Sequence, residues 1–211
     1  MDRSYKFWDR MSRRYSQHPL ADERAYLRKL QAMRAELDPY LDVLEFGCGT
    51  GATALILAPH ARHYRAVDFS PRMIEIAQEK AARSHIESLT FECAAFEALE
   101  LADDSVDVVI GMSVLHLQRD WRDVIARVYR ALRPGGVFFS STACIGDFMP
   151  ALRYVAPAGR MLGALPRLNV FRRAELTQCI VDTGFIIEQQ WQPAEKQGVF
   201  IAAAKAEQGR G

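Results

Sequence analysis

The sequence has few cysteines, and none are spaced as a metal site or a redox motif requires. Cys48, Cys93, Cys144 and Cys179 are scattered through the 211 residues without a C-x-x-C pair. Structural zinc sites and small disulfide-bonded domains both need closely spaced cysteines. The pattern therefore indicates reduced thiols in a cytosolic protein, and we expect no bound metal ion.

The sequence also lacks an excess of charge of one sign and a long apolar run. Its 27 lysines and arginines nearly balance its 26 aspartates and glutamates, so net charge gives no support to nucleic-acid binding. No stretch reaches the roughly 18 apolar residues of a membrane-spanning helix, and the amino terminus lacks the apolar core of a signal peptide. We expect a soluble, cytoplasmic protein with a single domain over residues 1–211.

What the sequence does have is a glycine-rich turn after an apolar segment. Residues 43–51 read Val-Leu-Glu-Phe-Gly-Cys-Gly-Thr-Gly, and a helical run follows over residues 52–58. This layout is typical of a buried strand that turns sharply into a helix. Gly47, Gly49 and Gly51 allow positive φ and close approach of a ligand, and the helix start offers free N–H groups. The turn predicts a cofactor site; three glycines in five residues disfavour the alternative, a turn that binds nothing.

Two classes of cofactor bind at such a turn, and Glu45 helps to distinguish them. Residues 47–52 fit the dinucleotide motif G-x-G-x-x-G/A, and Asp68 follows at the distance of a ribose-binding acid. A carboxylate two residues before the first glycine opposes a pyrophosphate but attracts a cofactor with an ammonium and a sulfonium group. A NAD-dependent reductase would also need a Tyr-x-x-x-Lys pair, which no tyrosine of this sequence provides.

From Glu45 to Gly51 the sequence resembles the first motif of the class I S-adenosylmethionine (SAM)-dependent methyltransferases. Residues 132–136, Leu-Arg-Pro-Gly-Gly, resemble the loop before the fifth strand of the same family. The resemblance implies SAM as the cofactor and methyl transfer as the reaction. The alternative is a non-catalytic SAM-binding or regulatory protein with the same fold.

The amino-terminal segment extends the resemblance. Trp8-Asp9, Ser12 and Tyr15 are similar to the helix W/F-D-x-x-A-x-x-Y of many small-molecule methyltransferases, with Ser12 in place of the usual alanine. In that family the helix covers the cofactor, and its tyrosine lies near the methionine end. Aromatic and basic residues alternate here as in nucleic-acid-binding segments, but an amphipathic helix over the domain is the ordinary interpretation.

Strand and helix patterns alternate along the chain and predict an α/β fold. After a helical cap over residues 1–40, we expect strands near 41–46, 62–67, 88–93, 106–111, 137–141, 185–191 and 199–204, and helices near 51–58, 71–82, 120–132 and 172–183. The short connection between the last two strands permits only antiparallel pairing. We therefore predict a doubly wound, Rossmann-like seven-stranded sheet with an antiparallel carboxy-terminal hairpin, as the resemblance also implies.

In such a sheet, ligands bind at the carboxyl ends of the strands. Asp68 is expected to accept hydrogen bonds from the ribose, and Phe69 either lies against the adenine or belongs to the core. At the end of the third strand, Ala95 and Phe96 stand where related enzymes usually carry an acid, so backbone N–H groups and Phe96 would have to recognise the adenine. The full set of expected cofactor-binding residues is Tyr15, Glu45, Gly47, Cys48, Gly49, Gly51, Asp68, Phe69, Met73, Ala95, Phe96 and Met112.

His116 follows the fourth strand and is the candidate catalytic residue. It is either a general base or a residue that packs beside the cofactor loop, and packing is the preferred interpretation. Residues 144–171 are rich in apolar residues and contain one acid, Asp147. We expect short helical turns that form a lid over a partly apolar small-molecule substrate, with membrane or lipid contact as a lesser alternative. No nucleic-acid partner is expected, and the oligomeric state is left open.

Overall fold

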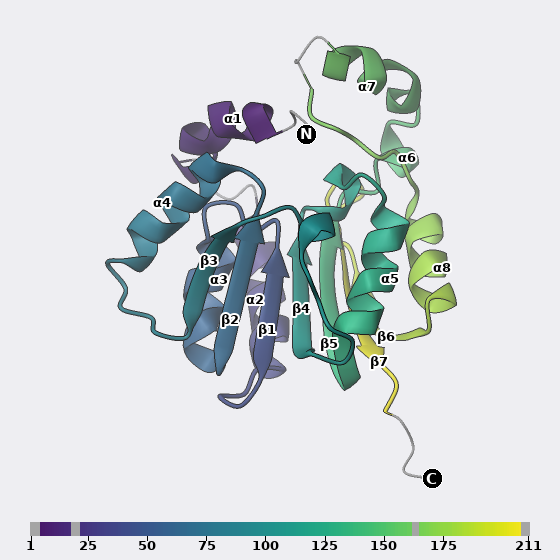
Figure 1. The fold of residues 1–211 in the computed structure, drawn as a ribbon. Coiled ribbons are helices and arrows are strands. Elements are labelled where there is room, and N and C mark those ends of the chain that lie inside the picture. The colour runs from purple at the N-terminus through teal and green to yellow at the C-terminus, as the bar shows by residue number, and fades with distance from the viewer. Residues whose placement is uncertain (1–4, 18–21, 162–164, 208–211) are drawn as a thin grey trace. The chain divides into compact units, whose positions relative to one another are not determined.

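The structure is a computed structural model that describes residues 5–17, 22–161 and 165–207. Tyr15 and Gln17 are described by their backbone alone. The chain divides into two compact units, Met1–Leu99 and Glu100–Gly211. Figure 1 labels the helices and strands of both units.

The first unit contains three parallel strands in the order β3-β2-β1. These strands are β1 (Asp42–Phe46), β2 (His63–Asp68) and β3 (Leu89–Cys93). The helices of this unit are α1 (Tyr5–Gln17), α2 (Glu23–Ala35), α3 (Ala52–Leu57), α4 (Pro71–Ala81) and two short 3-10 turns, η1 (Ala58–His60) and η2 (Phe96–Ala98). Helix α4 packs on β2 and β3, and α1 lies beside α4 (Figure 1).

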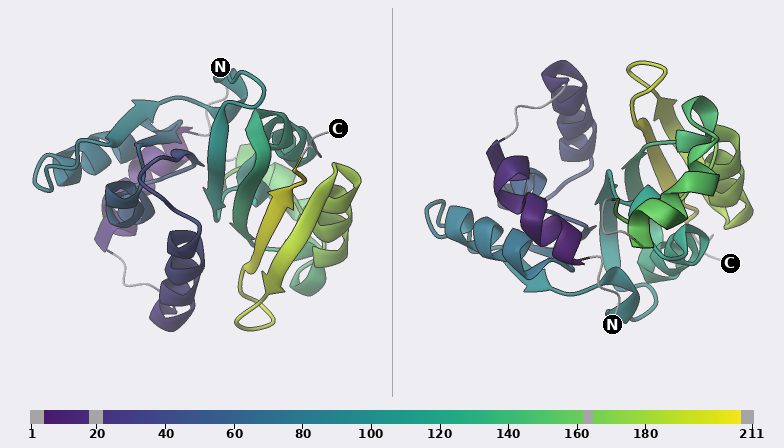
Figure 2. Two further views of the ribbon diagram at one scale, coloured as in Figure 1. Left: turned by 90° about the horizontal axis from the view of Figure 1, so that it is seen from below. Right: turned by 90° about the horizontal axis from the view of Figure 1, so that it is seen from above.

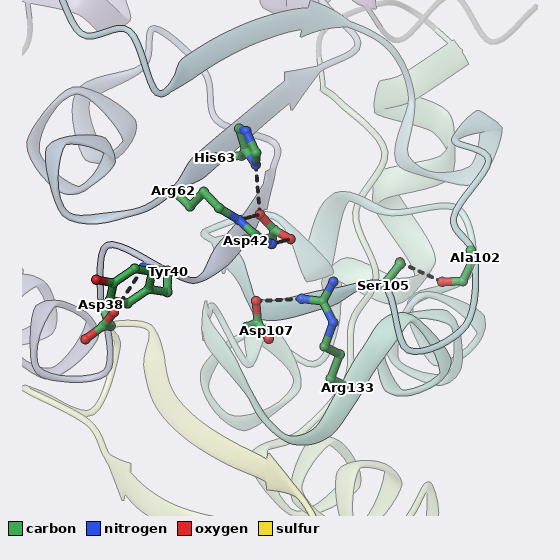
Figure 3. Close-up of polar contacts among 9 residues, drawn as sticks. All are labelled: Asp38, Tyr40, Asp42, Arg62, His63, Ala102, Ser105, Asp107 and Arg133. Atoms are coloured by element: carbon green, nitrogen blue, oxygen red, sulfur yellow. Dashed lines mark hydrogen bonds and ion pairs between the residues drawn. The ribbon is translucent and has the colours of Figure 1, made fainter.

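Local sequence explains where these elements begin. Ser70 is the N-cap of α4, its hydroxyl accepts a hydrogen bond from the N–H of Met73 at 3.2 Å, and Pro71 takes the first helical position. At the opposite ends of the strands, Asp42 at the start of β1 accepts hydrogen bonds from Arg62, the residue before β2 (Figure 3). The last four residues of β1 are buried, as the apolar run predicted.

The second unit contains four strands in the order β4-β5-β7-β6. Its strands are β4 (Val106–Met112), β5 (Leu132–Thr142), β6 (Phe185–Trp191) and β7 (Val199–Lys205), and its helices are η3 (Leu115–Leu117), α5 (Trp121–Ala131), α6 (Ile145–Phe148), α7 (Leu152–Met161) and α8 (Arg173–Asp182). β4 and β5 are parallel, whereas β7 is antiparallel to both β5 and β6. Figure 2 shows β6 and β7 joined by a single loop.

The predicted fold class is confirmed. The strand order is that of a seven-stranded sheet, and pairing is parallel within β3-β2-β1 and between β4 and β5. The last two strands form the antiparallel hairpin expected from their short connection. Each predicted strand and helix of the α/β alternation is present, with boundaries that differ by one or two residues in most cases.

The start of β5 differs from the prediction. Residues 133–136 were expected to be a loop before a strand at Val137, but β5 begins at Leu132 and contains them as an irregularity. Leu132 pairs with Val106, and regular pairing resumes where Val137 meets Val108. Pro134 has no N–H group to donate to the neighbouring strand. Residues 133–136 therefore do not pair regularly with β4, although β5 continues through them. Arg133 bonds Asp107 of β4 at 2.6 Å and holds this irregularity in place (Figure 3).

The segment over residues 144–171 is also more regular than predicted. Instead of short turns alone, it contains α7, a helix of ten residues with Pro157 inside it. A proline in a helix removes the hydrogen bond to the carbonyl four residues earlier, here that of Arg153. Because Arg153, Tyr154 and Val155 are exposed, water can satisfy that carbonyl, and the helix continues through the proline. The sequence also predicts a break in the amino-terminal helical cap at His18-Pro19, and these two residues lie outside the described ones.

Replacing Gly51 is predicted to destabilise the packing of the first unit. Its φ is +76°, and a Cβ added there would lie 2.6 Å from Cζ of Phe91 in β3. Gly51→Ala should therefore lower the free energy of unfolding by roughly 1–3 kcal/mol, from left-handed backbone strain and from this contact. Urea denaturation measures the loss. Adding Phe91→Leu should restore the part due to the contact, and an unchanged unfolding midpoint for Gly51→Ala would contradict the prediction.

Candidate cofactor site and relation to known proteins

The acid of the glycine motif is buried at the end of β1. Glu45 is 1% exposed, and its Oε2 accepts a hydrogen bond from the hydroxyl of Tyr64 in β2 at 2.8 Å. Burial raises the pKa of Glu45 to about 8, and the nearby Asp68 adds to the rise, while the bond from Tyr64 opposes it. In the free protein near neutral pH, Glu45 is therefore largely protonated. A cation that approached would favour its charged form.

The glycine turn has the backbone conformation that its sequence requires. Gly47, Gly49 and Gly51 have φ values of 65°, 55° and 76°, in the left-handed region. Cys48 between them is buried, and its N–H donates to the carbonyl of Val67 in β2 at 3.1 Å. Burial raises the pKa of its thiol, which suits a packing residue better than a nucleophile. The turn is thus attached to the neighbouring strand through its own backbone.

Asp68 lies at the carboxyl end of β2 and contacts the glycine turn directly. Its Oδ2 accepts the N–H of Gly49 at 3.0 Å, and its Oδ1 accepts the N–H of Ser70 at 2.9 Å. Burial raises the pKa of Asp68, and these two donors oppose the rise. An ionised carboxylate has about four acceptor positions, so two remain for a ligand such as a ribose diol.

A lysine of α4 contacts the end of the turn. Nζ of Lys80 in α4 donates to the carbonyl of Thr50 at 3.1 Å and lies 3.0 Å from its hydroxyl. The turn is therefore held by β2 through Asp68 and by α4 through Lys80. Such a turn can bind a ligand without first becoming ordered, which reduces the entropic cost of binding.

The remaining expected residues of the first unit have different surroundings. Phe96 is buried, and its ring lies 4.5 Å from that of Phe46, so it packs in the core. Met73 is buried on α4, whereas Phe69 and Ala95 are half-buried. The structure brings Glu45, the three glycines, Cys48 and Asp68 together. It gives Phe96 and Met73 packing roles, and their cofactor contacts stay predictions. The side chain of Tyr15 lies outside the described part.

The expected residues of the second unit lie at the end of β4. Met112 is the last residue of this strand, and Ser113 after it has a φ of 55°. Nδ1 of His116 lies 2.9 Å from the hydroxyl of Thr142 at the end of β5, which also accepts the backbone N–H of His116. The carbonyl of His116 accepts the N–H of Asn169 at 2.7 Å. Burial lowers the pKa of His116 to about 4, so its imidazole is neutral at pH 7.

Several of these contacts were missed by sequence reasoning. Asp9 and Ser70 form a hydrogen bond of 2.6 Å between α1 and α4, and Thr142 and Asn169 position His116. The W-D pair of α1 was recognised from the sequence, but that pattern does not say which side chain Asp9 contacts. No local sequence pattern predicts a contact between two residues that lie 61 positions apart in the chain.

Comparison with known proteins identifies the family. A family model described as a methyltransferase domain matches residues 43–136. A probable S-adenosylmethionine-dependent methyltransferase from Mycolicibacterium smegmatis is 30% identical over 192 residues, which cover 89% of this chain and 67% of that protein. The chain belongs to the SAM-dependent methyltransferase family. It is an enzyme of this class, SAM is its cofactor, and the glycine turn lies inside the matched region.

Solved structures agree on the fold. A putative SAM-dependent methyltransferase from Listeria monocytogenes matches 88% of this chain and all of its own, with a TM-score of 0.73 and 20% identity. Geranyl diphosphate C-methyltransferase from Streptomyces coelicolor was solved in complex with S-adenosyl-L-homocysteine. The match covers 87% of this chain and 79% of that enzyme, with a TM-score of 0.70 and 15% sequence identity. Apart from the M. smegmatis protein, the chain spans 27–60% of the length of seven curated relatives that it matches.

The structure also bears on two other expectations. Across residues 5–17, 22–161 and 165–207, no helix is both long and apolar enough to span a membrane. Over the same residues, no three or more His, Cys, Asp and Glu side chains are grouped as metal ligands would be.

The protonation of Glu45 predicts how stability depends on pH. Its pKa is raised on folding, so the folded protein binds a proton that the unfolded chain releases above about pH 4.5. The contribution of the protonated Glu45 to the free energy of unfolding is complete below about pH 4.5 and is lost as pH rises through about 8. The unfolding free energy of the wild type should therefore fall relative to that of Glu45→Gln, by roughly 3 kcal/mol or more between pH 5 and 8.

Chemical denaturation at several pH values measures this difference. Glu79→Gln is the matched control, because Glu79 is exposed on α4 and its side chain makes no hydrogen bond or ion pair with the described residues. The unfolding free energy of Glu79→Gln should vary with pH in parallel with that of the wild type. Parallel curves for Glu45→Gln and the wild type would refute a protonated Glu45.

Proposed function

We propose that this protein transfers the methyl group of SAM to a small, partly apolar molecule. The observation that carries the proposal is the pair of buried carboxylates, Glu45 and Asp68, at a glycine turn with three positive φ values. Two acids beside the turn favour a cofactor with a cationic amino acid end over a pyrophosphate. The residues fit SAM, with Glu45 toward the ammonium end and Asp68 toward the ribose.

When bound, SAM supplies an electrophilic methyl group whose leaving group is a neutral thioether. The protein therefore needs to hold the reactants in line and to exclude water rather than to supply a nucleophile. Asp68 and the turn would fix the cofactor, and Glu45 would balance its ammonium group. Phe69 and the backbone at Ala95, together with Tyr15, Met73, Phe96 and Met112, are proposed to complete the contacts with the cofactor.

The role proposed for His116 is positioning rather than proton abstraction. A general base works best when its pKa lies near the working pH, and burial lowers that of His116 to about 4. The contacts of its Nδ1 with Thr142 and of its carbonyl with Asn169 instead connect the end of β4 with β5 and with the segment before α8. His116 thus holds three parts of the second unit in register.

The segment over residues 144–171 supports an apolar substrate. Its two ends are held together by a hydrogen bond of 2.9 Å from the N–H of Gly146 to the carbonyl of Phe171. Between them, α7 buries only Ala156 and exposes Tyr154 at 80% and Met161 at 89%. Exposed apolar side chains between fixed ends suit a lid that closes on an apolar ligand. Membrane contact by this segment, a cytoplasmic location and the absence of a nucleic-acid partner remain predictions.

The proposed cofactor contacts are tested by Asp68→Ala. Loss of a charge-assisted hydrogen bond should weaken binding of SAM or S-adenosylhomocysteine roughly tenfold to a hundredfold. Calorimetry measures the affinity, and transfer of tritium from labelled SAM to a panel of small metabolites measures activity. Glu79→Gln should behave as the wild type in both assays. Unchanged affinity in a folded Asp68→Ala protein would remove Asp68 from the site, and no transfer to any metabolite by the wild type would favour a non-catalytic SAM-binding protein.

Replacement of His116 separates a base from a positioning residue. With an accepted substrate, His116→Ala should lower kcat by less than about tenfold, whereas loss of a general base typically costs roughly a hundredfold to ten-thousandfold. NMR titration of the wild type should place its pKa near 4, so the ring should stay neutral from pH 5 to 8. Thr142→Val should alter the ring-nitrogen shifts without abolishing activity. A drop of several orders of magnitude in kcat, with cofactor affinity retained, would assign the base role to His116.

A further inference from the structure

The side chain of Asp9 joins α1 to the start of α4. Its Oδ1 accepts a hydrogen bond from the hydroxyl of Ser70 at 2.6 Å and lies 3.4 Å from the N–H of Arg72. Among the described elements, α4 is the one that α1 packs against most (Figure 1). A carboxylate at a helix N-terminus is favoured by the free N–H groups and by the helix dipole. Asp9 thus connects α1 with the N-terminus of α4.

Ser70 connects this contact to the cofactor site. Its hydroxyl donates to Asp9 and accepts from Met73, while its backbone N–H donates to Oδ1 of Asp68. The other oxygen of Asp68 accepts the N–H of Gly49 in the glycine turn. An unbroken chain of hydrogen bonds therefore runs from α1 through Asp9, Ser70 and Asp68 to the turn. Ser70 is fully buried, so water cannot readily replace its partners.

The Asp9 carboxylate is also close enough to Asp68 to interact with it electrostatically. The negative charge of Asp9 adds to the effect of burial in raising the pKa of Asp68. Placing a second acid near the ribose-binding acid is unfavourable, and the hydrogen bond from Ser70 offsets that repulsion. A side chain with the same shape and an acceptor oxygen but no charge would keep the hydrogen bond and lose the repulsion.

We propose that Asp9 is a positioning residue that docks α1 on the start of α4 and, through Ser70, couples α1 to Asp68. The inference deepens the proposed function, because it takes the cofactor to bind at Asp68 and the glycine turn. Coupling is reciprocal: a ligand bound to Asp68 stabilises the docked α1, and a docked α1 strengthens binding of the ligand.

The experiment compares Asp9→Ala and Asp9→Asn in the full chain. Hydrogen exchange of the amides of residues 5–17 in the ligand-free protein measures docking of α1. Calorimetry with S-adenosylhomocysteine measures the coupling. Asp9→Ala should speed exchange in α1 and weaken affinity, each roughly tenfold, as expected for loss of a hydrogen bond to a charged group. Asp9→Asn keeps an acceptor for Ser70 and should stay within about threefold of the wild type.

Two controls separate this role from a general loss of stability. Glu79→Gln, the same kind of charge change at an exposed position of α4, should leave both measurements unchanged. Ser70→Ala removes the shared hydrogen-bond partner, so adding Asp9→Ala to it should have little further effect on affinity or on exchange. Thermal unfolding by circular dichroism confirms that each variant is folded.

The possible failures are distinguishable. Exchange in α1 that is unchanged in Asp9→Ala overturns the docking role, whether or not a ligand binds. Faster exchange with unchanged affinity, or additive effects of Asp9→Ala and Ser70→Ala, overturns the coupling. A wild type that does not bind S-adenosylhomocysteine refutes the placement of the cofactor and the coupling together, while the exchange data still decide the docking of α1.

Discussion

The hydrogen bonds accepted by the Asp68 carboxylate are the contacts on which the candidate cofactor site depends. One oxygen holds the backbone of the glycine turn, and the other holds the residue that begins α4. A buried carboxylate without donors would be strongly unfavourable, so the two N–H groups and the carboxylate constrain one another. The end of β1, the end of β2 and the start of α4 are fixed by one side chain. A ligand that bonds the remaining positions of this carboxylate meets a site that is already formed.

The second acid of the site explains why a cationic cofactor suits it. Glu45 and Asp68 lie on the neighbouring strands β1 and β2, and burial together with the charge of Asp68 raises the pKa of Glu45. In the free protein Glu45 keeps its proton, and the hydroxyl of Tyr64 bonds it. An ammonium group nearby would allow both acids to ionise, whereas a pyrophosphate would oppose it. Cofactor binding is thereby expected to be accompanied by proton release.

The sequence predicted the fold and the framework of the site because both depend on local patterns. The α/β alternation, the glycine turn and the acid that follows β2 are each contained in a few consecutive residues. The missed features depend on contacts between distant residues, as with Asp9 and Ser70 or His116 and Thr142. Short turns were expected over residues 144–171 and a loop over residues 133–136, because proline and glycine usually interrupt helices and strands. Solvent exposure of α7 and the Arg133–Asp107 pair allowed the helix and the strand to continue.

The position of β7 between β5 and β6 affects how the chain is made. Residues 137–142 of β5 pair with residues 199–204 of β7, which are synthesised about sixty residues later. The three strands of the first unit, by contrast, lie within residues 42–93 and pair with near neighbours in sequence. On the ribosome, β1 to β3 can assemble early, while β5 keeps an unpaired apolar edge until residues 199–204 have emerged. During synthesis, therefore, the second unit is the one most exposed to aggregation and most in need of chaperone protection.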